Sequence, residues 1–161
     1  MILSVVLLVI VLYIIYDLYF PKTVKIRYVN DVDWEIKKVK HGDWIDLYVN
    51  EDVKLKKGEF KLINLGINVI LPKGYELNIV PRSSTFKHFG VIQTNHFGVI
   101  DNTYCGNDDI IYFPAYALCD TEIKKGERIC QARINKVQRV RIKFVDKACD
   151  KNRGGIGSTG R

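Results

Sequence analysis

Short alternating runs of apolar and polar residues dominate the chain after its first 20 positions. Residues 24–29 (VKIRYV), 60–80 and 139–145 (RVRIKFV) have the pattern of β-strands, and Pro72-Lys73-Gly74 marks a turn within the second stretch. No long helical period occurs outside the N-terminus. Short strands separated by Gly, Pro and Asn residues, which favour turns, predict an all-β sandwich or barrel.

The first 20 residues form a separate hydrophobic segment. Residues 1–16 are apolar except for Ser4, and Lys22, Lys25 and Arg27 follow soon after. The run is close to the roughly 20 apolar residues of a bilayer-spanning helix, whereas a cleaved signal peptide would carry its basic residues before the run. The pattern predicts membrane attachment through residues 2–20, with the main domain in the cytoplasm. The alternative is a hydrophobic helix packed on the domain or on a partner.

The composition favours an anionic ligand. Lys and Arg number 25 against 18 Asp and Glu, which gives a formal net charge of +7. The basic residues are spread along the chain and no RNA-binding signature occurs, so a small phosphorylated ligand is favoured over nucleic acid. The four cysteines are not spaced as a CxxC motif, and the three histidines do not have the spacing of metal ligands, which argues against a zinc site.

Two stretches combine residues that bind phosphate or accept a proton. PRSSTFKHFGV (81–91) places Arg82 and two serines directly after a strand, a set suited to phosphate. In NHFGVIDNTYCG (95–106), Asp101 follows an apolar pair and precedes a turn. Partial desolvation there would raise the basicity of its carboxylate; the alternative is an Asx residue that starts the turn.

Two further stretches carry polar residues on expected strands. KKGERICQARI (124–134) turns at Gly126 and presents Gln131, which either contacts a ligand or belongs to the polar face of a hairpin. GDWIDLYV (42–49) contains Asp43 and Asp46, three residues apart. Strand alternation places these two carboxylates on different faces, so they do not form an obvious metal-binding pair.

The chain ends in RGGIGSTGR (153–161), which contains four glycines. Such a stretch cannot bury enough surface to offset its own ordering entropy. It is either a disordered terminus or a phosphate clamp, in which glycine N–H groups, the hydroxyls of Ser158 and Thr159 and the guanidinium of Arg153 surround an anion.

In chain order, GDWIDL, PRSS, NHFGVIDNTYCG, GERICQ and RGGIGSTG resemble the five motifs of the trimeric dUTPase family, most closely its phage and Gram-positive branch. The resemblance covers residues 23–161. It implies an all-β, jelly-roll-like distorted barrel of the β-clip type, to which this chain adds an N-terminal hydrophobic helix. The implied organisation is a hydrophobic segment (1–20), a β-domain (23–150) and a glycine-rich arm (151–161) that closes over the substrate.

The resemblance also implies a function: hydrolysis of dUTP to dUMP and pyrophosphate with Mg²⁺, which limits uracil incorporation into DNA and supplies dUMP for thymidylate synthesis. The enzyme would be a homotrimer whose active sites are each built from three chains. Asp101 would activate the attacking water, Tyr104 would pack under the deoxyribose, and Asp46 would contact Mg²⁺ only through water. The other substrate-binding residues implied are Arg82, Ser83, Ser84 and Gln131 at the phosphates, a hairpin from Asn95 through Gly98, Val99 and Ile100 at uracil, and Arg153, Ile156, Gly157, Ser158 and Thr159 in the arm.

Two positions depart from the family pattern: Ile156 stands where an aromatic residue is usual, and Ser84 where the second motif usually has glycine. Two other functions share these features. A dCTP deaminase has the same fold but needs a carboxylate beside the cytosine amino group, for which no clear candidate occurs. A non-catalytic dUTP-sensing module would not need a general base, so the presence of Asp101 argues against it.

Overall fold

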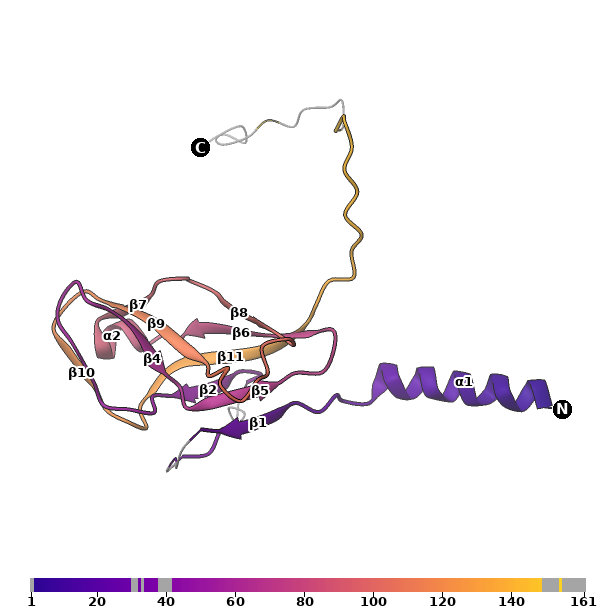
Figure 1. Ribbon diagram of the computed structural model, residues 1–161, viewed down its shortest axis with the longest axis horizontal. Coiled ribbons are helices and arrows are strands. Elements are labelled where there is room, and N and C mark those ends of the chain that lie inside the picture. Colours follow the sequence, from indigo (N-terminus) through magenta and orange to yellow (C-terminus); the bar gives the residue numbers. More distant parts are fainter. Residues whose placement is uncertain (1, 30–31, 33, 38–41, 149–153, 155–161) are drawn as a thin grey trace.

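The computed structural model describes residues 2–29, 32, 34–37, 42–148 and 154. Within these residues a β-rich domain is preceded by one long helix (Figure 1). The helices are α1 (Ile2–Tyr19) and α2 (Thr85–Phe89), and the strands are β1 (Lys25–Tyr28), β2 (Ile45–Tyr48), β3 (Val53–Leu55), β4 (Phe60–Asn64), β5 (Ile67–Ile70), β6 (Tyr75–Pro81), β7 (Val91–Gln93), β8 (Gly98–Asp101), β9 (Tyr112–Ala117), β10 (Thr121–Ile123) and β11 (Arg128–Lys136).

Two larger antiparallel sheets provide most of the core. One has the strand order β2-β11-β6-β8 and the other β4-β9-β7, while β1-β5 and β3-β10 form two-stranded sheets. Ile79 of β6 and Phe113 of β9 belong to one buried cluster, so side chains from both larger sheets fill the same interior. The all-β prediction is confirmed, but the expected barrel is not closed: the described strands divide into four separate sheets.

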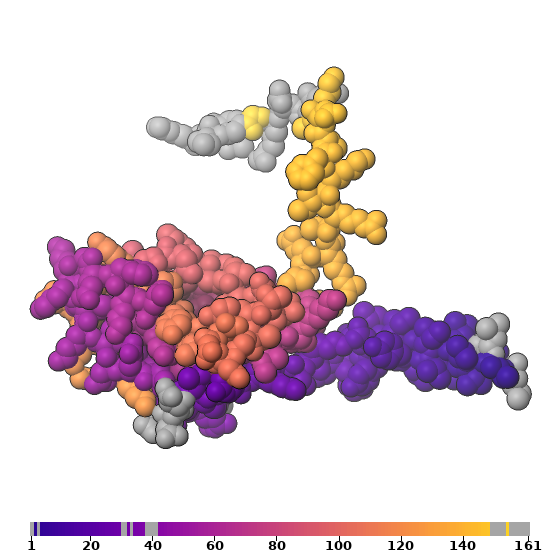
Figure 2. Space-filling model, viewed as in Figure 1, coloured from indigo at the N-terminus to yellow at the C-terminus, as the bar shows by residue number. Residues whose placement is uncertain are grey.

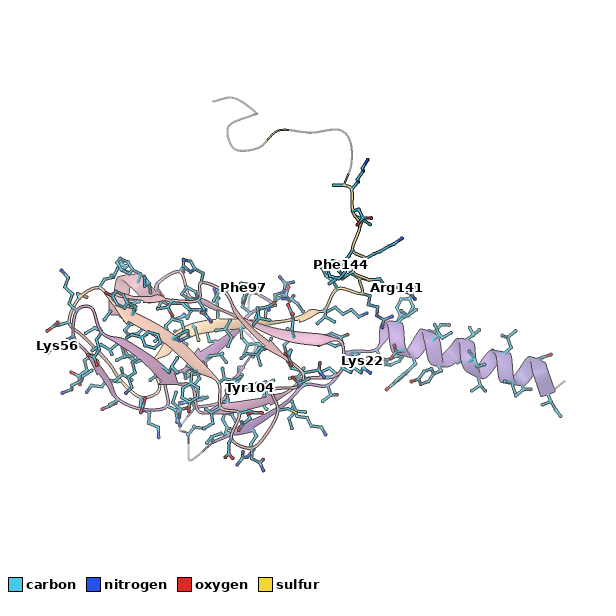
Figure 3. All side chains as sticks on the ribbon, turned by 45° about the horizontal axis from the view of Figure 1, so that its top comes forward. Lys22, Lys56, Phe97, Tyr104, Arg141 and Phe144 are labelled. Carbon is cyan, nitrogen blue, oxygen red and sulfur yellow. The ribbon has the colours of Figure 1, made fainter. Side chains whose placement is uncertain are left out.

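The hydrophobic alternation located several strands correctly. Residues 24–29 contain β1, and residues 60–80 contain β4, β5 and the start of β6, with a turn at Gly74 where φ is 84°. The strand expected at 139–145 is wrong. Residues 138–148 leave the domain as an extended segment without strand pairing (Figures 1 and 3). Their apolar side chains Val140, Ile142 and Phe144 are exposed. The alternation is real, but none of the described strands offers a free edge beside it to accept its hydrogen bonds.

Helix α1 projects from the domain, and its described side chains are exposed (Figure 2). A Lys22–Asp17 ion pair links its last turn to the segment that follows. Across the part of the chain that the structure describes, no helix is long and apolar enough to cross a membrane. The prediction that residues 1–20 span a bilayer is therefore not supported, and the helix does not pack on its own domain either.

Candidate functional site

One buried carboxylate joins three segments that are distant in the sequence. Asp46 on β2 is 7% exposed. Its Oδ1 lies 3.0 Å from Nε of Arg82, and its Oδ2 lies 3.0 Å from Nη1 of Arg128. Arg82 follows β6, and Arg128 begins β11 beside a β-bulge, an irregularity that changes the direction of a side chain. Asp46 thus holds two guanidinium groups together at one end of the four-stranded sheet.

The loop after β6 is held by Thr85, which the sequence reasoning did not identify. The backbone N–H of Arg82 donates to Oγ1 of Thr85 (2.9 Å), and that hydroxyl donates to the carbonyl of Ile129 on β11 (2.6 Å). Thr85 is 1% exposed, so this anchor is inaccessible to water. Of the two predicted phosphate contacts that precede it, Ser83 is exposed, and Ser84 is half-buried at the start of α2.

These segments surround a cavity of about 430 Å³. It is lined by Arg82, His88, Phe89, Glu122, Gly126, Glu127 and Arg128. Gln131, the other predicted phosphate contact, is half-buried and donates through Nε2 to the carbonyl of Pro81 (3.4 Å). The structure therefore brings Arg82 and Gln131 into one region and adds Arg128, a second cation that the sequence reasoning missed. A guanidinium pair of this kind is suited to bind an anion.

A second cavity, of about 320 Å³, contains the predicted base and aromatic residue. It is lined by Val99, Ile100, Asp101, Tyr104, Ile110, Ile111 and Tyr112. The Tyr104 hydroxyl donates to the carbonyl of Ile110 (3.0 Å), which orients a ring that remains 40% exposed (Figure 3). Partial burial raises the pKa of Tyr104, so its phenol stays neutral. Apolar walls with one carboxylate are suited to a small ring-shaped ligand.

Asp101 differs from the expectation of a desolvated carboxylate. It is exposed, and its Oδ1 accepts hydrogen bonds from the hydroxyl and from the backbone N–H of Thr103. The hydroxyl bond and then the N–H bond hold the pKa of Asp101 below its usual value, because both stabilise the charged form. The Asx turn weighed as the alternative is therefore what the structure contains. Asp101 is ionised at neutral pH, and both hydrogen bonds from Thr103 go to Oδ1.

The hairpin expected from Asn95 to Tyr104 is also different. Residues 98–101 form the single strand β8, which pairs with β6 rather than with a strand inside the segment. Asn95 is exposed in the turn before β8, and neither it nor Gly98 lines the cavity of Asp101. The arm residues Arg153, Ile156, Gly157, Ser158 and Thr159 lie outside the described residues.

The two cavities lie at opposite edges of one sheet. Asp46 is on β2 and Asp101 on β8, with β11 and β6 between them, which separates them by roughly 14 Å across the sheet. Asp46 pairs with Gln131, which in turn pairs with Val80 of β6, whereas Asp101 pairs with Glu76 of β6. The two carboxylates are therefore also displaced along the strand direction, at right angles to the first separation, by roughly 13 Å. Within one chain, the guanidinium pair and the Asp101 carboxylate are too far apart to act on the same phosphorus atom.

Comparison with known sequences identifies related proteins. The family model described as dUTPase matches residues 44–160. The chain is 56% identical over 138 residues to an SPbeta prophage-derived deoxyuridine 5'-triphosphate nucleotidohydrolase of Bacillus subtilis (strain 168), covering 85% of this chain and 97% of that protein. It is 40% identical over 127 residues to the deoxyuridine 5'-triphosphate nucleotidohydrolase of Nautilia profundicola, covering 77% of this chain and 88% of that protein.

Solved structures resemble the fold. The Staphylococcus bacteriophage 80alpha dUTPase with dUPNHPP superposes with a TM-score of 0.73 at 20% identity, covering 87% of this chain and 99% of the phage chain. A mutant dUTPase of phage phi11 of Staphylococcus aureus, described with a structural Mg(II) ion, has a TM-score of 0.69 at 17% identity, covering 78% of this chain and 98% of that one. At these identities the likeness shows a shared fold, which confirms the expected jelly-roll-like architecture.

Replacing Asp46 by Asn should lower the free energy of unfolding by about 1–3 kcal/mol, because two guanidinium groups lose their charged partner. Urea denaturation at one protein concentration measures this change. Asp108→Asn makes the same change in net charge at an exposed side chain and should alter stability by no more than about 0.5 kcal/mol. Equal stability of the two variants would show that the ion pairs do not stabilise the fold.

Replacing Thr103 by Val should raise the pKa of Asp101, because the variant loses the hydroxyl that stabilises the carboxylate. Carboxyl-carbon NMR titration of residue 101 measures the pKa directly. Thr103→Ser keeps the donor and should titrate like the wild type. A pKa in the Val variant that is unchanged or lower would contradict the hydrogen bond as its cause.

Proposed function

The chain belongs to the dUTPase family, and we propose that Asp101, at the cavity that Tyr104 lines, is the general base of its reaction. As a deoxyuridine 5'-triphosphate nucleotidohydrolase, the chain hydrolyses dUTP to dUMP and pyrophosphate. Family membership decides against the dCTP deaminase and the non-catalytic sensing module. The observation that carries the proposed role is the geometry of Asp101: it is ionised, it lines a cavity, and both hydrogen bonds from Thr103 go to the same one of its two oxygens.

The nucleoside occupies the cavity between β8 and residues 110–112. The Tyr104 ring, oriented by its bond to the Ile110 carbonyl, lies under the deoxyribose and leaves no room for a ribose 2′-hydroxyl. Val99 and Ile100 provide apolar and backbone contacts to uracil. Because these groups are in place before the substrate arrives, little ordering entropy is lost on binding.

Asp101 then accepts a proton from water. Thr103 holds Oδ1, so Oδ2 is the oxygen that faces the water molecule. As the water oxygen attacks the α-phosphorus, its proton moves to the carboxylate, and the bond from that phosphorus to the bridging oxygen breaks to release pyrophosphate. A positioned base of this kind contributes about 10²–10⁴-fold to the rate. Because the pKa of Asp101 is lowered, this base is lost only when the pH falls well into the acid range.

Arg82, Arg128 and Gln131 bind the phosphates, together with the serines after Arg82. Asp46 keeps the two guanidinium groups adjacent in the absence of substrate, so the positive charge is already oriented when phosphate arrives. In this proposal the arm completes the site: Arg153, Ser158 and Thr159 close over the phosphates, and Ile156 and Gly157 cover the base.

Mg²⁺ enters with the substrate, because triphosphate oxygens are the hard ligands that this ion prefers. The predicted contact of Asp46 with Mg²⁺ through water stays a prediction. Both carboxylate oxygens of Asp46 are paired with arginine side chains, and the residue is 7% exposed. In this proposal the main role of Asp46 is to hold the two arginines.

The enzyme acts as a homotrimer with shared sites. The distance between Asp46 and Asp101 supports this arrangement, because one chain cannot bring both halves to a single dUTP. The extended segment 138–148 gives further support, because its apolar side chains Val140, Ile142 and Phe144 are exposed on their own chain and would be covered by a neighbouring chain. Figure 3 shows Phe144 away from the β-domain. The cytoplasmic location inferred from the basic residues after the hydrophobic segment stays a prediction.

The Asp101→Asn variant should retain dUTP binding and lose about 10²–10⁴-fold in kcat, because the amide cannot accept the proton. Pyrophosphate release from dUTP measures kcat, and calorimetry with a non-hydrolysable dUTP analogue measures binding. Asp108→Asn is the control of equal charge. Near-normal turnover in Asp101→Asn would remove Asp101 from the mechanism.

Shared sites predict complementation between two inactive variants. Asp101→Asn and Arg82→Ala damage different halves of the site, so a trimer assembled from both contains some sites with two intact halves. Coexpression in equal amounts should recover about a quarter of the wild-type activity, since each site draws its halves from different chains. The molar mass of the assembly, measured by light scattering, should correspond to three subunits. A monomer, or no recovery in mixed trimers, would refute the shared-site arrangement.

A further inference from the structure

A buried asparagine on β5 is covered by the turn that precedes β9. Asn68 is 2% exposed, and its two neighbours in the strand belong to the core, so strand alternation directs its side chain to the opposite face of β5. On that face Nδ2 donates to the carbonyl of Gly106 (3.1 Å) and to the carbonyl of Asp109 (2.6 Å). Asn68 therefore holds both ends of the turn formed by residues 106–109.

Arg27 on the neighbouring strand completes this contact. It is the β1 partner of Asn68 in the antiparallel register. Its Nη1 donates to Oδ1 of Asn68 (3.2 Å) and to the carbonyl of Asn107 (3.0 Å). The two carbonyls in front of Nδ2 can only accept and the guanidinium can only donate, so the Asn68 amide has one possible orientation. Both of its donors and its oxygen are used, which offsets the cost of burying it.

The 106–109 turn is itself closed by two hydrogen bonds. The backbone N–H of Gly106 donates to Oδ2 of Asp109 (2.6 Å), and the backbone N–H of Asp109 donates to the carbonyl of Gly106 (3.1 Å). A Cβ atom at Gly106 would lie 2.9 Å from that Oδ2, so a side chain there would displace the carboxylate. The turn thus has a compact shape of its own, and the contacts with β1 and β5 fix where it lies.

This turn connects two residues of the cavity that contains Asp101. Tyr104 comes shortly before the turn and Ile110 directly after it, and both line that cavity. The Tyr104 hydroxyl donates to the Ile110 carbonyl, so the position of this carbonyl decides how the ring is oriented. Asn68 is not among the residues that line the cavity, so it acts on the ring only through the turn.

We infer that Asn68 and Arg27 are positioning residues for the choice of sugar: they hold the 106–109 turn so that the Ile110 carbonyl keeps the Tyr104 ring in the orientation that excludes a ribose. This inference rests on the proposed function, in which Tyr104 lies under the deoxyribose. Exclusion of one hydroxyl group depends on how closely the ring approaches the sugar. A turn that is free to move lets the ring shift and admits the 2′-hydroxyl of UTP.

The test compares kcat/KM for dUTP and UTP in the full-length protein. Asn68→Asp keeps the shape of the side chain and its acceptor toward Arg27, but it replaces both donors by an oxygen that repels the two turn carbonyls. Its preference for dUTP over UTP should fall about 10-fold. The loss should appear as a higher KM for dUTP with little change in kcat, because the variant leaves the proposed base Asp101 in place.

Two further variants separate the contact from the net charge. Arg27→Met should lower the preference by a smaller factor, because Asn68 keeps its own two bonds to the turn. Lys25→Met makes the same change in charge at an exposed residue of the same strand and should leave the preference unchanged.

Amide hydrogen exchange tests the turn without any substrate. The backbone N–H groups of Gly106 and Asp109 are hydrogen-bonded within the turn. Both should exchange faster in Asn68→Asp and Arg27→Met than in the wild type, because the turn opens more often when it is held less firmly. Lys25→Met should exchange like the wild type.

Three results would overturn the inference. Faster exchange with an unchanged sugar preference shows that the turn does not control the choice of sugar, and unchanged exchange shows that the two residues do not hold the turn. An equal loss of kcat with both substrates indicates a structural role alone. If Asn68→Asp does not fold, Arg27→Met still decides, because Arg27 is exposed. Absence of dUTP hydrolysis in the wild type is a separate result that refutes the proposed function, whereas the exchange measurement still reports on the turn.

Discussion

The ion pairs of Asp46 with Arg82 and Arg128 organise the phosphate-binding half of this protein. A carboxylate that is 7% exposed would be strongly unfavourable alone, and two adjacent guanidinium groups would repel each other. Together the three side chains carry one net positive charge, and the carboxylates of Glu122 and Glu127 line the same cavity. The ion pairs also tie β2, the loop after β6 and the start of β11 to one another. In our proposal the arrangement that ties these segments together is also the one that binds the phosphates.

The second constraint is the separation of this cluster from Asp101. A sheet four strands wide holds Asp46 with its two arginines at one edge and Asp101, the proposed base, at the other. The rigidity of the sheet prevents either half from moving to the other within one chain. In our proposal this separation makes assembly of several chains a condition of catalysis, and the exposed apolar side chains of residues 138–148 pack on a neighbouring chain.

Asp101 and Asn68 show how local contacts adjust the chemistry of the nucleoside-binding half. Asp101 remains a weak, ionised base because Thr103 stabilises its charged form, so its rate contribution depends on position more than on basicity. In our inference Asn68 acts one step further away, since it holds a turn beside the cavity and does not touch the substrate. Both effects arise from hydrogen bonds that fix the position of a neighbouring group.

The sequence by itself determined the local structure and the family. The alternation of apolar residues located β1, β4, β5 and β6, because strand periodicity is a property of consecutive residues. The order of five short motifs identified the family, because loop residues at strand ends retain their order along the chain, and it predicts functional roles for Arg82 and Asp101.

The tertiary structure alone decided which of these residues act together. Arg128 binds Asp46 across 82 positions, Thr85 is buried against β11, and Asn68 binds two carbonyls of a turn 38 and 41 positions later. None of these contacts has a signature in the neighbouring sequence, because strand order and register set them. The error at residues 139–145 has the same origin. Alternation shows that a segment can form a strand, but only the fold provides the edge with which it pairs.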